Sequence, residues 1–108
     1  MMKVKNKGSI DIDGYKIKCY VLIDNTRIIS GNLFDDFKEN EVQFNPRIKG
    51  YTIESIIKLF GVKNKALEIL LKKALIVLVD SITKNKTEDL MSFDDAMSII
   101  IQAKPPKK

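Results

Sequence analysis

Two tight-turn signals near the start of the chain constrain its fold most strongly. Asp13-Gly14 and Asp24-Asn25 each separate short segments in which apolar and polar residues alternate. Both pairs tolerate the left-handed backbone conformation that two-residue hairpin turns require. The pattern therefore predicts a three-stranded antiparallel meander formed by residues 8–12, 15–23 and 26–29.

Two-residue turns would also fix how these strands pair. The first turn places Ile10 opposite Ile17, and the second places Val21 opposite Ile28. Because side chains alternate between the two faces of a strand, one face should be apolar and buried. This predicted core face comprises Ile10, Ile12, Tyr15, Ile17, Cys19, Val21 and Ile28. The opposite face is expected to carry Lys16, Lys18, Tyr20, Leu22, Arg27 and Ile29.

The middle of the chain is expected to hold little regular structure. Ser30 or Asn32 can cap a short helix over residues 33–38, because either side chain can accept a hydrogen bond from a free amide of the first turn. Residues 39–50 then read as a connector with one extended piece, residues 42–44.

Two helices are expected next. Thr52 can cap a helix over residues 53–60, and Gly61 can end it. A longer helix should run from residue 63 to about residue 83. Its side chains are apolar nearly all round, so it is expected to be buried on several sides or to bury one side in another chain.

The end of the chain carries one more helical pattern. Ser92 can cap a helix that Pro105 and Pro106 end. The sequence therefore predicts an α+β fold in which a three-stranded antiparallel meander packs on three to four helices, one of them long and apolar. A single domain over residues 1–104 is expected, followed by a basic tail at residues 105–108.

Composition argues against an enzyme. The chain contains no histidine and a single cysteine, Cys19, so it lacks the commonest general base and the commonest metal ligand. The adjacent carboxylates Asp35-Asp36 and Asp94-Asp95 do not converge on one atom when they lie on helices. No metal, cofactor or catalytic site is expected. Asp80, near the end of the long helix, is expected to bind backbone amides or pair with a cation.

The same features indicate where the protein acts. A single cysteine excludes an internal disulfide, which suits a reducing cytoplasm. No apolar run follows the basic first residues, and the most apolar stretch, residues 74–79, is far shorter than the roughly 20 residues that span a bilayer. A cytoplasmic protein without a membrane partner is therefore expected.

The charge of the chain is its clearest hint about partners. The net charge is +5, which favours nucleic acid, an anionic membrane or an acidic protein. The alternative is that the lysines only solvate the surface. Just two basic residues, Arg27 and Arg47, are arginines, the type that reads base edges most often.

The predicted outer sheet face is the best candidate for a nucleic-acid interface. Basic side chains beside an aromatic ring can contact phosphates and stack a base. The candidate residues are Lys16, Lys18, Tyr20, Arg27 and Arg47. Two alternatives stay open: tyrosine and arginine also anchor protein partners, and a basic face can simply be solvated.

A second candidate surface is the long apolar helix with the C-terminal segment. Phe93, Met97 and Ile100 recur at helical spacing and are the candidate partner-binding residues. The long helix is either the centre of the core or the interface of a homodimer. The basic tail either stays unfolded or folds on a partner.

Three matches in order suggest a family. The first is Cys19-Tyr20-Val21-Leu22 with Asp24, Thr26-Arg27 and Ser30-Gly31. The second is Phe44-Asn45-Pro46 followed by Gly50-Tyr51, and the third is Glu68-Ile69-Leu70 with Leu78-Val79-Asp80 and Thr83. Together they resemble, in shortened form, the N-terminal part of the phage and prophage domain family labelled P-sixty-three-C. The Gly-Tyr-Gln element that follows the aspartate in that family is absent here.

The resemblance implies a fold and a mobile-element context with a regulatory role, and no reaction. With the basic charge, it leads to the hypothesis of a non-enzymatic phage or mobile-element regulator that binds nucleic acid or a nucleoprotein. The alternative is a protein-interaction module, such as an antitoxin, an antirepressor or a host-defence inhibitor, that acts through the long helix and the C-terminal tail.

Overall fold

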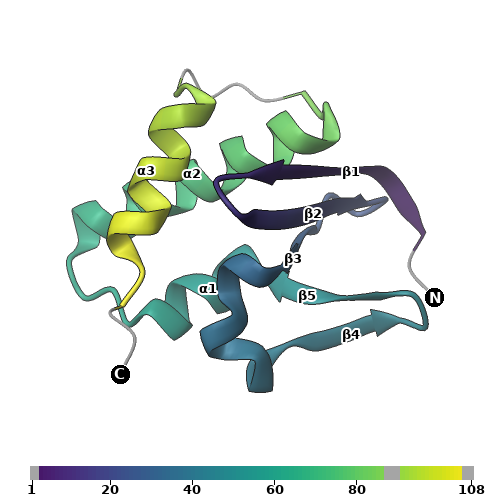
Figure 1. Ribbon diagram of the computed structural model, residues 1–108, viewed down its shortest axis with the longest axis horizontal. Helices are drawn as coiled ribbons and strands as arrows, with labels where there is room; N and C mark the ends of the chain where they lie inside the picture. Colours follow the sequence, from purple (N-terminus) through teal and green to yellow (C-terminus); the bar gives the residue numbers. More distant parts are fainter. Residues whose placement is uncertain (1–2, 87–90, 106–108) are drawn as a thin grey trace.

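The computed structural model describes residues 3–86 and 91–105, and its fold is α+β (Figure 1). A five-stranded antiparallel sheet has the strand order β1-β2-β3-β5-β4. Its strands are β1 (Val4–Ile12), β2 (Tyr15–Leu22), β3 (Arg27–Gly31), β4 (Val42–Asn45) and β5 (Ile48–Thr52). The helices are the 3₁₀ helix η1 (Asn32–Asn40) and the α-helices α1 (Ile53–Phe60), α2 (Lys65–Thr83) and α3 (Phe93–Ala103).

The first hairpin forms with the predicted turn and register. Asp13 and Gly14 both have positive φ, at 50° and 82°. Such a turn matches the twist of the flanking strands. Ile10 pairs with Ile17 across β1 and β2, as the sequence predicts. The strand β1 begins earlier than expected, at Val4.

The second hairpin differs from the prediction by one residue. Arg27 pairs with Val21, and Ile28 pairs with Tyr20, so the expected Val21–Ile28 pairing is wrong. Asn25 takes the left-handed conformation alone, with φ 69°, and its amide donates to the Leu22 carbonyl. These features close a three-residue loop instead of a two-residue turn.

The one extra loop residue reverses which face of the sheet each β3 side chain occupies. Side chains alternate along a strand, so a shift of one residue moves each of them to the other face. Arg27 and Ile29 therefore lie on the helix-facing side with Val21, and Ile28 lies on the outer side with Tyr20. The sequence predicts the reverse for all three β3 residues, and that prediction is wrong.

The connector expected over residues 39–50 contains a third hairpin, which the sequence does not predict. The extended piece at residues 42–44 belongs to β4, which turns at Pro46-Arg47 into β5. The strand β5 then pairs with β3, where Ile29 lies opposite Tyr51. The sheet therefore has five strands instead of the three expected.

The helices begin and end close to the expected residues. Thr52 and Ser92 cap α1 and α3 as predicted, because their side chains accept from the amides of Ser55 and Asp95. Gly61 ends α1 in the left-handed conformation, with φ 66°. The longest helix, α2, begins after its own cap, Asn64.

The helices cover one face of the sheet (Figure 1). α2 packs on β1, β2 and β3, and α3 packs on α2. Gly8 marks the closest approach, because a Cβ there would collide with the Ile82 carbonyl at the end of α2. The inner core between the layers includes Ile17, Cys19, Val21, Ile29, Tyr51, Ile56, Leu71, Leu75, Leu78 and Ile100.

The N-terminal half of α2 carries exposed apolar side chains, so burial on several sides, the first of the two predicted alternatives, holds only for its C-terminal half. Ile69 is 50% exposed, and Leu67 and Leu70 are 39% and 40% exposed. Lys72 and Lys73 are also exposed. The C-terminal half is the buried part. None of the helices among residues 3–86 and 91–105 combines the length and apolarity needed to cross a membrane.

A small outer cluster lies on the opposite side of the sheet. Leu22, Ile28 and Ile48 are its buried members, and Val4, Tyr20 and Phe44 pack against them. The cluster joins the β4–β5 hairpin to the outer face of β2 and β3. Residues 106–108 of the predicted tail, and residues 87–90 between α2 and α3, lie outside the described residues.

Candidate nucleic-acid interface

Tyr20 is the centre of the candidate interface. It lies on the outer face of β2, directly opposite Lys7 of β1, and it is half-buried against the outer cluster. Lys18 precedes it by two residues on the same face, about 7 Å along the strand. Lys18 is exposed and pairs across the sheet with two serines, Ser9 and Ser30.

Two surface hollows meet at Tyr20. The larger has a volume of ≈ 860 Å³ and lies between the β1 strand and the β4–β5 turn. The smaller, of ≈ 350 Å³, lies along β1 and β2. We call this pair of hollows the Tyr20 cradle; its lining residues are Val4, Lys5, Lys7, Gly8, Ser9, Lys18, Tyr20, Asn45, Pro46, Arg47 and Ile48.

The cradle is positively charged. Its cations are Lys7, Lys18 and Arg47, and none of its lining residues is a carboxylate. Lys5 also lines the cradle, but the Lys5 ammonium donates to Asn25. A neighbouring hollow of ≈ 490 Å³ also touches Tyr20, Lys18 and Arg47, but it contains Asp35 and Glu41. An anion is therefore attracted to the cradle and less strongly to the neighbouring hollow.

The β4–β5 hairpin brings Arg47 to Tyr20. The Asn45 side chain accepts a 2.8 Å hydrogen bond from the Arg47 amide, which shapes the turn. Ile48, the next residue, is buried in the outer cluster beneath it. The structure thus places three of the five predicted residues, Lys18, Tyr20 and Arg47, around one site.

Lys16 and Arg27 lie elsewhere. Lys16 is at the other end of β2, opposite Asp11 and next to the first turn. Arg27 lies on the helix-facing side, where its guanidinium binds Asp80. The expected grouping of Arg27 with Lys18 and Tyr20 on one face is therefore corrected, and the cause is the three-residue second loop.

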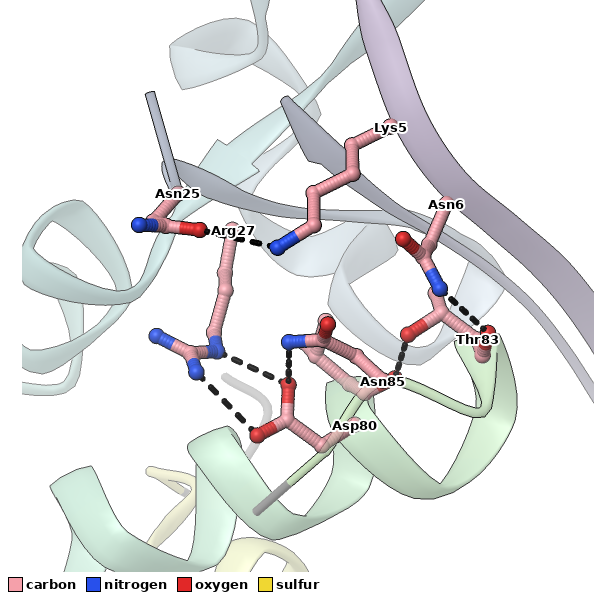
Figure 2. Close-up of polar contacts among 8 residues, drawn as sticks. Lys5, Asn6, Asn25, Arg27, Asp80, Thr83 and Asn85 are labelled. Atoms are coloured by element: carbon pink, nitrogen blue, oxygen red, sulfur yellow. Dashed lines mark hydrogen bonds and ion pairs between the residues drawn. The ribbon is translucent and has the colours of Figure 1, made fainter. Parts of the chain in front are cut away.

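Figure 2 shows that Arg27 makes a two-pronged contact with Asp80 near the C-terminal end of α2. The Nε–Oδ1 distance is 2.9 Å and the Nη2–Oδ2 distance is 3.1 Å. The Asp80 side chain is fully buried, and the Nδ2 of Asn85 donates to its Oδ1 at 3.1 Å. This confirms the prediction that Asp80 pairs with a cation.

Further contacts tie the N-terminal strand to the same region (Figure 2). The Asn6 side chain donates to the Thr83 carbonyl, and the Lys5 ammonium donates to the Asn25 side chain at 3.4 Å. The loop itself is held by Asp24, which accepts from the Thr26 amide. Hydrogen bonds from Thr26 lower the pKa of Asp24, so this carboxylate stays charged in the loop.

Cys19 is an inner-core residue and offers no reactive thiolate. It is fully buried between β2 and the helices. Burial raises the pKa of the Cys19 thiol to about 12, and the negative charge of Asp80 adds to the rise. Reactive cysteines have lowered values and partial exposure.

The partner-binding residues predicted on the last helix are mostly buried within this chain. Ile100 is fully buried in the inner core and Met97 is 6% exposed, while Phe93 is half-buried against the same core. Met97 and Ile100 belong to the inner core that α3 forms with α2, so a partner could reach them only if α3 separated from α2. Ile101, which is 43% exposed, is the apolar side chain that α3 presents to solvent.

Sequence reasoning missed Lys5, Lys7 and Pro46 as members of the site. The alternation of Lys3-Val4-Lys5-Asn6-Lys7 is a strand signal that extends β1 and would have placed Lys7 beside Tyr20. No local signal predicts that Pro46 lines the same hollow as Tyr20, because this placement depends on the β4–β5 hairpin.

Neither a group of metal-ligating side chains nor a comparison with known proteins points to a further site. Within the described part of the chain, no group of three or more cysteine, aspartate and glutamate side chains could hold a metal ion. Comparison of the chain with protein-family models, with curated proteins and with solved structures finds no match in any of the three.

Proposed function

We propose that the protein binds nucleic acid through the Tyr20 cradle and acts as a non-enzymatic regulator of a phage or mobile element. The observation that carries the binding proposal is the grouping of Lys7, Lys18 and Arg47 around one aromatic ring, in two hollows without a lining carboxylate. The mobile-element context rests on the sequence resemblance alone.

The cradle suits a phosphate chain better than a single small anion. Its cations come from separate elements, β1, β2 and the β4–β5 turn, so they are spread over a surface rather than gathered at one point. A linear polyanion can contact several of them in succession and release counterions from each phosphate. Nucleic acid is the polyanion that also offers rings for Tyr20.

Binding should depend strongly on salt. If about three phosphates are neutralised, the logarithm of the affinity should fall with the logarithm of the salt concentration, with a slope of roughly −2 to −3. Fluorescence anisotropy of a labelled oligonucleotide, over a salt series, measures this slope. An affinity that does not respond to salt would contradict a phosphate-based interface.

A charge-reversal pair locates the interface. Lys18→Glu with Arg47→Glu should weaken binding at least tenfold, because both cations line the cradle. Lys58→Glu with Lys72→Glu is the matched control, since these exposed lysines of α1 and α2 line a different hollow and the change in net charge is the same. Equal losses in the two variants would show that net charge alone, and not the cradle, drives binding.

A protein-interaction module is the second candidate function. It is favoured by the exposed apolar side chains of Leu67, Ile69 and Leu70 at the N-terminal half of α2. Such a surface fits a second copy of the chain or the target of an antitoxin, antirepressor or host-defence inhibitor. Binding that survives high salt and is lost in Ile69→Glu, but not in the cradle variants, would support this function instead.

A further inference from the structure

We propose that the Tyr20 cradle receives an unpaired nucleobase, so the protein recognises single-stranded nucleic acid in preference to duplex. This inference rests on the proposed function and names its substrate class. It follows from three properties of Tyr20: the ring is recessed, it is held in place by packing, and cations flank it.

The recessed position of the ring excludes a paired base. Tyr20 is half-buried and lines both hollows of the cradle, where β1 and the β4–β5 turn rise beside it. In a duplex, the faces of the bases are stacked on one another and only phosphates and groove edges are presented. A duplex can therefore touch the lysines at the rim, while only an unpaired base can enter and stack on the ring.

The ring is prepared for stacking before any ligand arrives. It packs against Leu22, Ile28 and Ile48, which are all buried. No hydrogen bond holds the Tyr20 hydroxyl within the described residues, so its position depends on the packing of its apolar ring. A fixed aromatic platform loses little conformational freedom on binding, which favours affinity.

Cations surround the ring at positions where they can contact the phosphates of a nucleic-acid strand whose base is stacked there. Lys7 lies directly across the sheet from Tyr20, and Lys18 lies two residues away on the same face. Arg47 borders the ring from the β4–β5 turn. When one base of a nucleic-acid strand stacks on the ring, the neighbouring phosphates lie near these cations. Contacts to the phosphates and to the base then reinforce one another.

Three probes of equal length separate stacking from charge. The first is a single-stranded oligothymidine of about twelve nucleotides, the second is the same backbone with abasic sites, and the third is a duplex. The abasic strand keeps the phosphates and lacks the bases. We expect the wild-type protein to bind oligothymidine at least fivefold more tightly than the abasic strand, because stacking one base typically contributes about 1–3 kcal/mol.

Two variants of the ring complete the test. Tyr20→Phe should bind all three probes as the wild type does, since the hydroxyl has no bonded partner among the described residues. Tyr20→Leu keeps an apolar side chain on the outer cluster and should lose about five- to 100-fold of its affinity for oligothymidine. Its affinity for the abasic strand and for the duplex should stay within about twofold.

The possible failures are distinguishable. Equal wild-type affinity for oligothymidine and the abasic strand would overturn the single-strand inference while the proposed function stands, and that comparison needs no variant. An equal loss of affinity for all three probes in Tyr20→Leu would also overturn the single-strand inference. The ring would then maintain the shape of the cradle and would not stack on a base. Absence of binding to every probe at low salt would overturn the proposed function itself.

Discussion

The two faces of the sheet use arginine in opposite ways. On the inner face, Arg27 reaches the fully buried carboxylate of Asp80 and satisfies it with two hydrogen bonds. On the outer face, Arg47 is exposed on a turn, and no carboxylate lines the cradle beside it. The chain has only these two arginines, so one stabilises the fold and the other lies exposed on a turn.

The difference between them comes from the backbone and not from residue type. A two-residue turn would have placed Arg27 on the outer face with Tyr20, whereas the three-residue loop places it against α2. A basic residue in a strand therefore identifies an interface only once the register of the strand is known.

Substitution of Arg27 should have the largest effect on stability. Arg27→Leu leaves the Asp80 charge buried without its cation, and we expect a loss of about 4–5 kcal/mol in the free energy of unfolding. Urea denaturation measures this loss. Arg47→Leu is the matched control and should stay within about 0.5 kcal/mol of the wild type.

Neutralising the orphaned carboxylate should recover part of that loss. Asp80→Asn in the Arg27→Leu background removes the buried charge and keeps the contact with Asn85. If Arg27→Leu proves no more costly than Arg47→Leu, the proposed division of roles between the two arginines is wrong.

The contrast also shows how far sequence alone could go. The first hairpin was predictable because Asp13 and Gly14 both adopt the positive φ that their types favour. In the second loop only Asn25 does so, while Asp24 uses its side chain to accept from Thr26. The same two residue types fit either loop, so composition could not fix the register.

The candidate site was predictable only in part for a similar reason. Lys18 and Tyr20 lie two residues apart on one strand, and alternation alone puts them on one face. Arg47 joins them through the β4–β5 hairpin, and β5 resembles a connector because Lys49 and Gly50 break its apolar pattern. The burial of β5 depends on the packing of Ile28 and Tyr51 in the two clusters. These contacts join distant parts of the chain, so a local sequence pattern does not reveal them.

Truncated side chains in the inner core and the outer cluster should compare the two faces of the sheet, with slightly smaller losses in the free energy of unfolding. Leu75→Ala in the inner core should cost about 3–4 kcal/mol, because the residue is fully buried between layers that cannot easily collapse. Ile48→Ala in the outer cluster should cost about 2 kcal/mol, since the site borders an open hollow into which water can move. Chemical denaturation compares the two.

Hydrogen exchange should separate the same two variants by location. Ile48→Ala is expected to speed exchange of the β4 and β5 amides and to leave the α2 amides protected, because the small cluster joins only the hairpin to the sheet. Uniformly faster exchange over α2 in this variant would mean that the outer cluster supports the whole fold.

The buried thiol of the inner face should make stability depend on alkaline pH. The pKa of Cys19 is raised from 9.0 to about 12 by burial, so the unfolded chain loses this proton first as the pH rises. The contribution is fully present below about pH 9 and is lost between pH 9 and about 12, at no more than about 1.4 kcal/mol per pH unit.

Cys19→Ala isolates this contribution. Between pH 9 and 10 the variant should lack the downward slope in unfolding free energy that the wild type shows, although its overall stability is lower. Above pH 10, the raised pKa of Tyr51 gives both proteins a second decline, since burial and the nearby Glu41 and Asp35 raise it to about 12. Identical slopes below pH 10 in the two proteins would contradict the role of the thiol.

The smallest expected difference in stability is between variants of two lysines, one that ties two helices together and one that is exposed. Lys104, at the end of α3, donates to the Leu33 carbonyl at 2.8 Å and lies 3.5 Å from the Asp36 carboxylate, so it ties α3 to η1. Lys49 is exposed on β5 and borders the neighbouring hollow. Lys104→Met should therefore lower stability by about 1 kcal/mol, and Lys49→Met should change it by less than about 0.5 kcal/mol. Thermal denaturation of the two variants measures the difference, and a loss in Lys49→Met as large as in Lys104→Met would show that the exposed Lys49 supports the fold as much as Lys104 does.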